Sequence, residues 1–109
     1  MKPSRNQEIA DGLFMECLPV VKHAKLNISC DSCCFEMDFF NGIPRLTGVN
    51  AYESIVKVLK RFMDVLPVIA GGTVTAQFKV DAQIPFWVRI HASDEDSGRT
   101  LTFSLGDIK

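Results

Sequence analysis

The sequence predicts an α+β fold, a two-layer sandwich in which one long amphipathic helix packs on one face of a mainly antiparallel sheet of about five strands. Residues 50–66 carry apolar side chains at spacings of three and four, which is the periodicity of one helical face. Other segments alternate apolar and polar residues, as half-buried strands do. Their connections are short, which favours antiparallel neighbours. The expected order is a short helix, two strands, the long helix and three strands, written (α)ββαβββ.

The part of the chain before residue 50 is expected to form a short helix and a β-hairpin. Residues 6–18 fit a helix that Ser4 and Gln7 would cap, although the run LFMECL at its end could equally be a short strand. Residues 24–30 and 33–39 then alternate in polarity. Asp31 and Ser32 separate these two runs and are turn-forming residues, so the pattern suggests a hairpin.

The central helix is expected from Asn50 to Leu66. Asn50 occupies the N-cap position, and Glu53 follows three residues later as in a capping box. Charged residues fill the face opposite the apolar stripe, and Pro67 prevents the helix from continuing much further. Such a helix needs an apolar surface to cover, and the predicted strands supply it.

Three strands are expected after the helix, at residues 73–80, 84–92 and 100–105. Each alternates apolar and polar side chains. Gly71 and Gly72 provide a reversal before the first of them, and the polar run SDEDSGR forms a loop before the last. One helix covers only one face of such a sheet, so the other face is left to water or to a second copy of the protein.

Length and charge restrict the possible classes of protein. The chain has 109 residues, the size of one domain, which we expect to span residues 1–109. Twelve basic and thirteen acidic residues give a net charge of −1, without the basic patch that nucleic-acid binding requires. We find no secretory signal and no apolar run long enough to span a membrane. A cytoplasmic protein is therefore expected, without nucleic-acid or membrane partners.

Four cysteines lie close together in the sequence, at positions 17, 30, 33 and 34. A Cys-x-x-Cys pair on a hairpin is one half of a common zinc site, and Cys17 or His23 could add ligands. A second such pair is missing, so reduced thiols that behave as small apolar residues are the favoured interpretation, and no metal or cofactor is predicted. A thioredoxin-type redox motif opens a helix after a strand, whereas this pair is expected between two strands.

The sheet face that the helix leaves uncovered is the best candidate for a functional surface. Tryptophan and arginine beside carboxylates and an exposed phenylalanine are residue types that concentrate in protein interfaces. A solvated face with ordinary cross-strand pairs is the alternative. No catalytic residue is predicted, and the candidate binding residues are Glu36, Asp38, Phe40, Trp87, Arg89 and His91.

The leading functional hypothesis is a small non-enzymatic binding protein that uses this face, or a sheet edge, to bind another protein or a second copy of itself as a homodimer. A sensor or carrier with a small-molecule pocket between helix and sheet is one alternative. The other is an enzyme, because a central helix between strands is similar to the topology of the hot-dog fold, whose members include acyl-CoA thioesterases. That resemblance implies Glu53 or Asp64 as the catalytic acid, but Glu53 already has a capping role.

Overall fold

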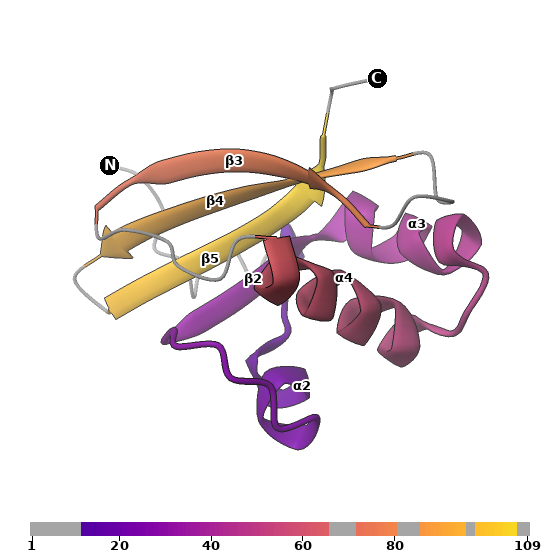
Figure 1. Ribbon diagram of the computed structural model, residues 1–109, viewed down its shortest axis with the longest axis horizontal. Helices are drawn as coiled ribbons and strands as arrows, with labels where there is room; N and C mark the ends of the chain where they lie inside the picture. The colour runs from indigo at the N-terminus through magenta and orange to yellow at the C-terminus, as the bar shows by residue number, and fades with distance from the viewer. Residues whose placement is uncertain (1–11, 66–71, 81–85, 96–97, 107–109) are drawn as a thin grey trace.

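The structure is a computed structural model that describes residues 12–65, 72–80, 86–95 and 98–106. Five strands of this part form one mixed sheet in the order β1-β2-β5-β4-β3, with helices packed against it (Figure 1). The predicted α+β class is therefore confirmed. The elements are β1 Phe14–Glu16, α2 Leu18–His23, β2 Ser32–Glu36, α3 Met37–Thr47, α4 Ala51–Val65, β3 Val74–Lys79, β4 Trp87–Glu95 and β5 Gly98–Leu105.

The sheet is mostly antiparallel, with one parallel pairing. β3 pairs with β4, β4 with β5, and β1 with β2, each in the antiparallel direction. β2 pairs in parallel with β5, and Phe35 lies opposite Phe103. A parallel pair requires a long crossover connection, and here the chain passes through α3, α4, β3 and β4 before it returns beside β2.

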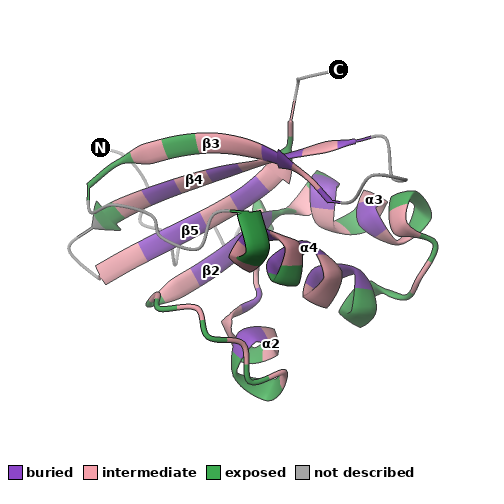
Figure 2. Cartoon of the chain, viewed as in Figure 1, coloured by how far each residue is buried: buried purple, intermediate pink, exposed green. Residues whose placement is uncertain are grey.

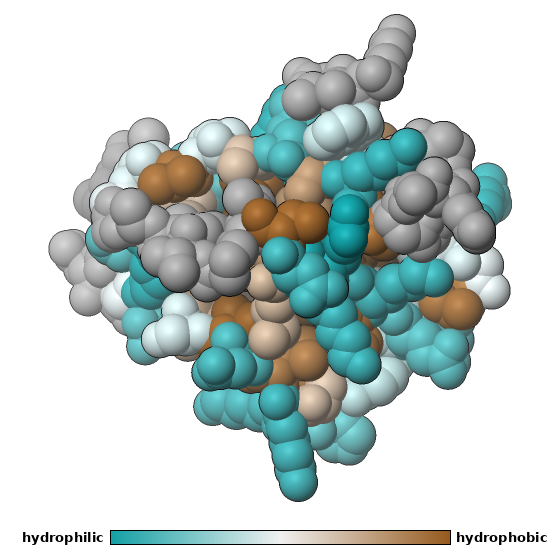
Figure 3. All heavy atoms as spheres, viewed as in Figure 1, coloured by the Kyte–Doolittle hydropathy of each residue, from teal (hydrophilic) through white to brown (hydrophobic). Residues whose placement is uncertain are grey.

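The helical layer contains α3 and α4 side by side on one side of the sheet, with α2 beside α4 and β2 (Figure 1). We call the sheet face that they cover the inner face. The expected layer held one helix of substance, so this part of the prediction was wrong. Figure 3 shows hydrophilic side chains across the region of α4, with hydrophobic ones visible between them.

Aromatic rings fill the space between the helices and the sheet. Phe103 is fully buried, and its ring centroid lies 5.1 Å from that of Phe35 and 5.3 Å from that of Phe62. Phe39 of α3 stacks on Phe35, and Phe78 of β3 contacts Phe62. Figure 2 shows buried residues at alternate positions along β4, as expected for a strand that places every second side chain in this core. In β5, Leu101 and Phe103 are the buried residues that belong to the core.

The predicted strand at residues 24–30 is wrong. The helix α2 ends at His23, and residues 24–30 are irregular, with Lys25 in the left-handed region at a φ of 56°. Pro19 lies in the first turn of α2, where the N–H that proline lacks would have no partner within the helix. The strand alternative for LFMECL is confirmed by β1 at Phe14–Glu16, while residues 6–11 lie outside the described residues.

The second predicted strand, residues 33–39, is correct only as far as Glu36. Met37 starts α3, in which Phe39 and Ile43, four residues apart, both face the core. Pro44 lies inside α3, and the helix continues past it to Thr47. Burial of this apolar stripe stabilises the helix by more free energy than is lost with the hydrogen bond that proline removes. Gly48 then ends the helix at a φ of 78°.

The predictions for the later elements agree with the structure except at the run SDEDSGR, which was expected to be a loop. Residues 93–95 of this run end β4, and residues 98 and 99 begin β5. The central helix is α4, and the Asn50 Oδ1 accepts the Glu53 N–H at 2.8 Å, as an N-cap should. The Arg61 Nε on its polar side donates to the Lys79 carbonyl at 3.0 Å and ties α4 to β3. The three later strands are confirmed as β3, β4 and β5, although residues 84 and 85 of the second lie outside the described residues.

Candidate functional site

The sheet has a second, outer face that none of the described helices covers. Strand alternation and register place polar side chains on most of it. Its members are Phe14 and Glu16 of β1; Ser32, Cys34 and Glu36 of β2; Thr100, Thr102 and Ser104 of β5; Trp87, Arg89, His91 and Ser93 of β4; and Thr75, Gln77 and Lys79 of β3.

Side chains that lie next to one another on neighbouring strands form rows across the outer face. One of these rows has an acidic residue near one end and a basic residue near the other. Arg89 lies opposite Ser104 on one side and Gln77 on the other. Phe35 pairs with Phe103, so Glu36 follows beside Ser104. The carboxylate of Glu36 is therefore two strands from the guanidinium of Arg89, a backbone separation of roughly 10 Å. The acidic group stands on β2 and the basic group on β4.

The next row is less exposed at its β2 side. The His91 Nδ1 lies 2.8 Å from the Thr75 hydroxyl, and Thr102 lies opposite His91. Beyond Thr102 stands Cys34, which is fully buried, as is Thr100 in the neighbouring row. The accessible part of the outer face therefore lies over β3, β4 and the end of β5, with Glu36 at its acidic border.

The structure brings together some of the predicted binding residues and separates others. Trp87, Arg89 and His91 alternate along β4 on the outer face. Glu36 shares that face on β2. Asp38 and Phe40 do not belong to the sheet, because the strand that was expected to carry them is the start of α3. Phe40 packs partly buried against the core, and Asp38 is an exposed residue in the first turn of the helix.

The Glu16 carboxylate is the centre of a polar cluster beside the cysteines. One of its oxygens accepts the backbone N–H of Leu18 at 3.0 Å and that of Cys33 at 2.9 Å. The other accepts the Ser32 hydroxyl at 2.6 Å and the Cys34 thiol at 3.5 Å. Glu16 therefore joins β1, the beginning of α2 and the beginning of β2. No local pattern in the sequence marks Glu16, because only the pairing of β1 with β2 brings it to these groups.

The four cysteines are all thiols, but their environments differ. Burial, followed by the nearby charge of Glu16, raises the pKa of the Cys17 thiol to about 12. A hydrogen bond with the Cys33 thiol lowers the pKa of Cys30, which is half-buried. That same hydrogen bond, together with burial, raises the pKa of Cys33 well above its ordinary value.

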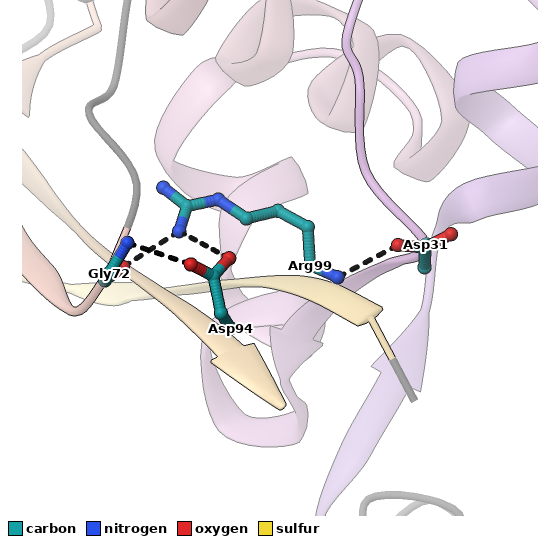
Figure 4. A network of polar contacts seen from close by, with 4 residues as sticks. All are labelled: Asp31, Gly72, Asp94 and Arg99. Carbon is teal, nitrogen blue, oxygen red and sulfur yellow. Dashed lines mark hydrogen bonds and ion pairs between the residues drawn. The ribbon is translucent and has the colours of Figure 1, made fainter. Parts of the chain in front are cut away.

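A second polar network fixes the Cys-x-x-Cys segment to the sheet (Figure 4). The Asp31 N–H donates to the Arg99 carbonyl, and the Arg99 N–H donates to the Asp31 carboxylate, both at 2.8 Å. The Arg99 guanidinium donates to Asp94 at 2.8 Å and to the Gly72 carbonyl at 2.7 Å. The Asp94 carboxylate accepts the Gly72 N–H. This hydrogen bond and the one from Arg99 lower the pKa of the Asp94 carboxyl. The hairpin expected at Asp31 and Ser32 is wrong, because residues 24–30 form no strand that could pair with β2, and Asp31 instead binds β5.

The residues considered for metal binding or catalysis do not form one site in the described part of the chain. His23 lies with Tyr52, its Nδ1 2.8 Å from the phenol oxygen. Among the described side chains, no three of the histidines, cysteines and acidic residues are placed so that they could share a metal ion. Glu53 and Asp64, the acids that the hot-dog resemblance implied, are exposed on α4.

Comparisons with protein-family models, curated proteins and solved structures found no match to this chain. In the described part of the chain, none of the helices combines the length and apolar character required to cross a membrane.

Proposed function

We propose that the protein is a cytoplasmic, non-enzymatic binding module whose outer face binds a second copy of the chain. The observation that carries this proposal is the charged row in which Glu36 stands on one side of Ser104 and Arg89 on the other. A symmetric homodimer requires a surface that is complementary to itself. The row is complementary to itself, because its acidic end on β2 can face the basic end on β4 of a second copy.

A two-fold axis near Ser104 would turn the row end to end. Glu36 of each copy then faces Arg89 of the other, and two such pairs form in one dimer. Two sheets packed face to face lie about 10 Å apart. Glutamate and arginine side chains extending toward each other from the two sheets span that gap and can form charge-assisted hydrogen bonds.

Trp87 supplies apolar area beside this row. It is half-buried on β4, opposite Lys79 of β3 and two residues before Arg89. Tryptophan and arginine are the residue types most enriched among those that dominate binding energy. Burial of the indole against the partner sheet would contribute affinity, while the charge pairs would fix the orientation of the two copies.

Charge reversal tests this arrangement through the oligomeric state. We expect the wild type to form a dimer in native mass spectrometry and in sedimentation at several concentrations. Glu36→Arg and Arg89→Glu should each raise the dimer dissociation constant at least about tenfold, since each places like charges together. The double reversal, which restores opposite charges in both pairs, should recover most of the affinity. Lys60→Glu, at an exposed position on α4, is the matched control and should leave the dimer unchanged.

Two results would contradict the proposal. A wild type that stays monomeric at all concentrations excludes self-association. A dimer that tolerates both single reversals and Trp87→Ala excludes the outer face as its interface. Circular dichroism and thermal unfolding of each variant show whether a loss of association is instead a loss of folding.

A further inference from the structure

Gly106 and Trp87 approach each other unusually closely on the outer face. Gly106 directly follows β5, and its N–H donates to the Trp87 carbonyl at 2.7 Å. A Cβ built on Gly106 would lie 3.0 Å from the Trp87 Cβ. Directly opposite Cβ atoms of an antiparallel pair are ordinarily about 4.5–5.5 Å apart. Only the lack of a side chain at position 106 permits this approach.

The Gln77 side chain fills the space that a side chain at position 106 would occupy. Gln77 stands on β3, opposite Arg89 of β4, whereas Gly106 lies on the other side of β4. A Cβ on Gly106 would overlap with the Gln77 Oε1. The Gln77 side chain therefore crosses β4 on the outer face and ends over Gly106, beside Trp87.

This arrangement restricts where the Trp87 indole can lie. An aromatic side chain next to a glycine of the neighbouring strand can fold over it and cover the bare backbone. Here the Gln77 amide takes that place, and two side chains cannot occupy the same space. The indole is half-buried, and it cannot fold down onto Gly106 while the amide is present.

We propose that Gln77 is a positioning residue of the dimer interface, which holds the Trp87 indole where a second copy of the chain can bury it. This inference rests on the proposed function, because it concerns the same outer face. A tryptophan that is fully desolvated at an interface contributes strongly to binding. An indole already held in its bound position also loses less conformational entropy on association.

Loss of the Gln77 side chain tests this role through the indole itself. Trp87 is the single tryptophan of the chain, so the emission of tryptophan reports on it alone. In dilute, monomeric protein, Gln77→Ala should shift this emission to shorter wavelengths and reduce its quenching by acrylamide, because the indole folds onto Gly106. In sedimentation, the same variant should raise the dimer dissociation constant about fivefold or more.

A second substitution should reverse both effects. In the Gln77→Ala background, Gly106→Ala places a methyl group where the amide stood. The φ of Gly106 lies outside the left-handed region, so alanine adds no backbone strain there, and the Trp87 Cβ needs to move only slightly. The methyl group should again exclude the indole from this space and return the emission and the dissociation constant toward the wild type.

The double variant also separates positioning from direct contact. A hydrogen bond between Gln77 and the partner would not be restored by a methyl group on Gly106. Gly42→Ala in the Gln77→Ala background is the matched control. It adds a methyl group on α3, where a Cβ meets no atom within 4 Å, and should restore neither property.

The outcomes distinguish this inference from the dimer on which it rests. A wild type that stays monomeric refutes the dimer. If the wild type dimerises and Gln77→Ala changes neither emission nor association, Gln77 has no positioning role, although the charge pairs of Glu36 and Arg89 stand. A weaker dimer with unchanged emission, or one that Gly106→Ala does not restore, also overturns the role. Gln77→Thr, too short to reach Gly106 but well suited to a strand, provides the same comparison if thermal unfolding shows that Gln77→Ala does not fold.

Discussion

The contact between Asp31 and the β4–β5 hairpin can be tested by a single methyl group at Gly98. This glycine has a φ of 118°, where side chains are rarely found. A Cβ at this position would lie 2.9 Å from the Asp31 Cβ and closer still to its carboxylate. Gly98→Ala therefore combines backbone strain with a collision against the segment that carries Cys30 and Cys33.

The two costs can be estimated separately. A non-glycine residue in such a backbone conformation costs about 1–3 kcal/mol. The collision adds about 1–3 kcal/mol if Asp31 must move and its two hydrogen bonds to Arg99 are weakened. The total is about 2–6 kcal/mol. With an unfolding entropy of ~2.1 cal/mol/K per residue, each kcal/mol lowers the melting temperature by about 4 °C, so a loss of at least about 8 °C is expected.

Gly48→Ala is the matched control. Gly48 also has a positive φ, 78°, but an added Cβ there meets no atom within 4 Å. Its replacement should cost only about 1 kcal/mol, and urea unfolding of both variants gives the two free energies directly. If Gly98→Ala is no more destabilising than Gly48→Ala, Asp31 does not lie against the hairpin, and its anchoring to β5 is wrong.

Two further predictions concern local bonds. Asn50→Ala should lower the free energy of unfolding by about 1 kcal/mol through loss of the cap on the Glu53 N–H, whereas Asn50→Asp should retain it; chemical denaturation measures both. The lowered pKa of Asp94 means that its contribution to stability is present above the pKa of the unfolded chain and is lost as pH falls through the folded pKa. The wild type should therefore be more stable than Asp94→Asn at pH 6, and urea titrations toward pH 3 should show the difference shrinking; a difference that does not change with pH would contradict this assignment.

The elements that the sequence predicted well are those whose pattern of apolar and polar residues fits only one kind of secondary structure. The residues from Tyr52 to Phe62 have a helical period and a recognisable cap. Apolar and polar residues alternate along β3, along β4 as far as Ala92 and along β5 from Thr100. The run from Cys33 to Phe39 fits two structures, because Phe35 and Phe39 are an even number apart and also four apart. Packing of both rings in the core selects a strand for the first and a helix for the second, and that choice depends on contacts with Phe103 that a local pattern does not contain.

The candidate sites were likewise predicted only where they depend on a local pattern and not on contacts between distant segments. Trp87, Arg89 and His91 were placed correctly on one face because alternation within a single strand determines it. The relation of Glu36 to Arg89 depends on β5 lying between their strands, and the anchoring of Asp31 depends on Arg99, 68 residues away. The hairpin expected at Asp31 and Ser32 left no place for this contact with β5.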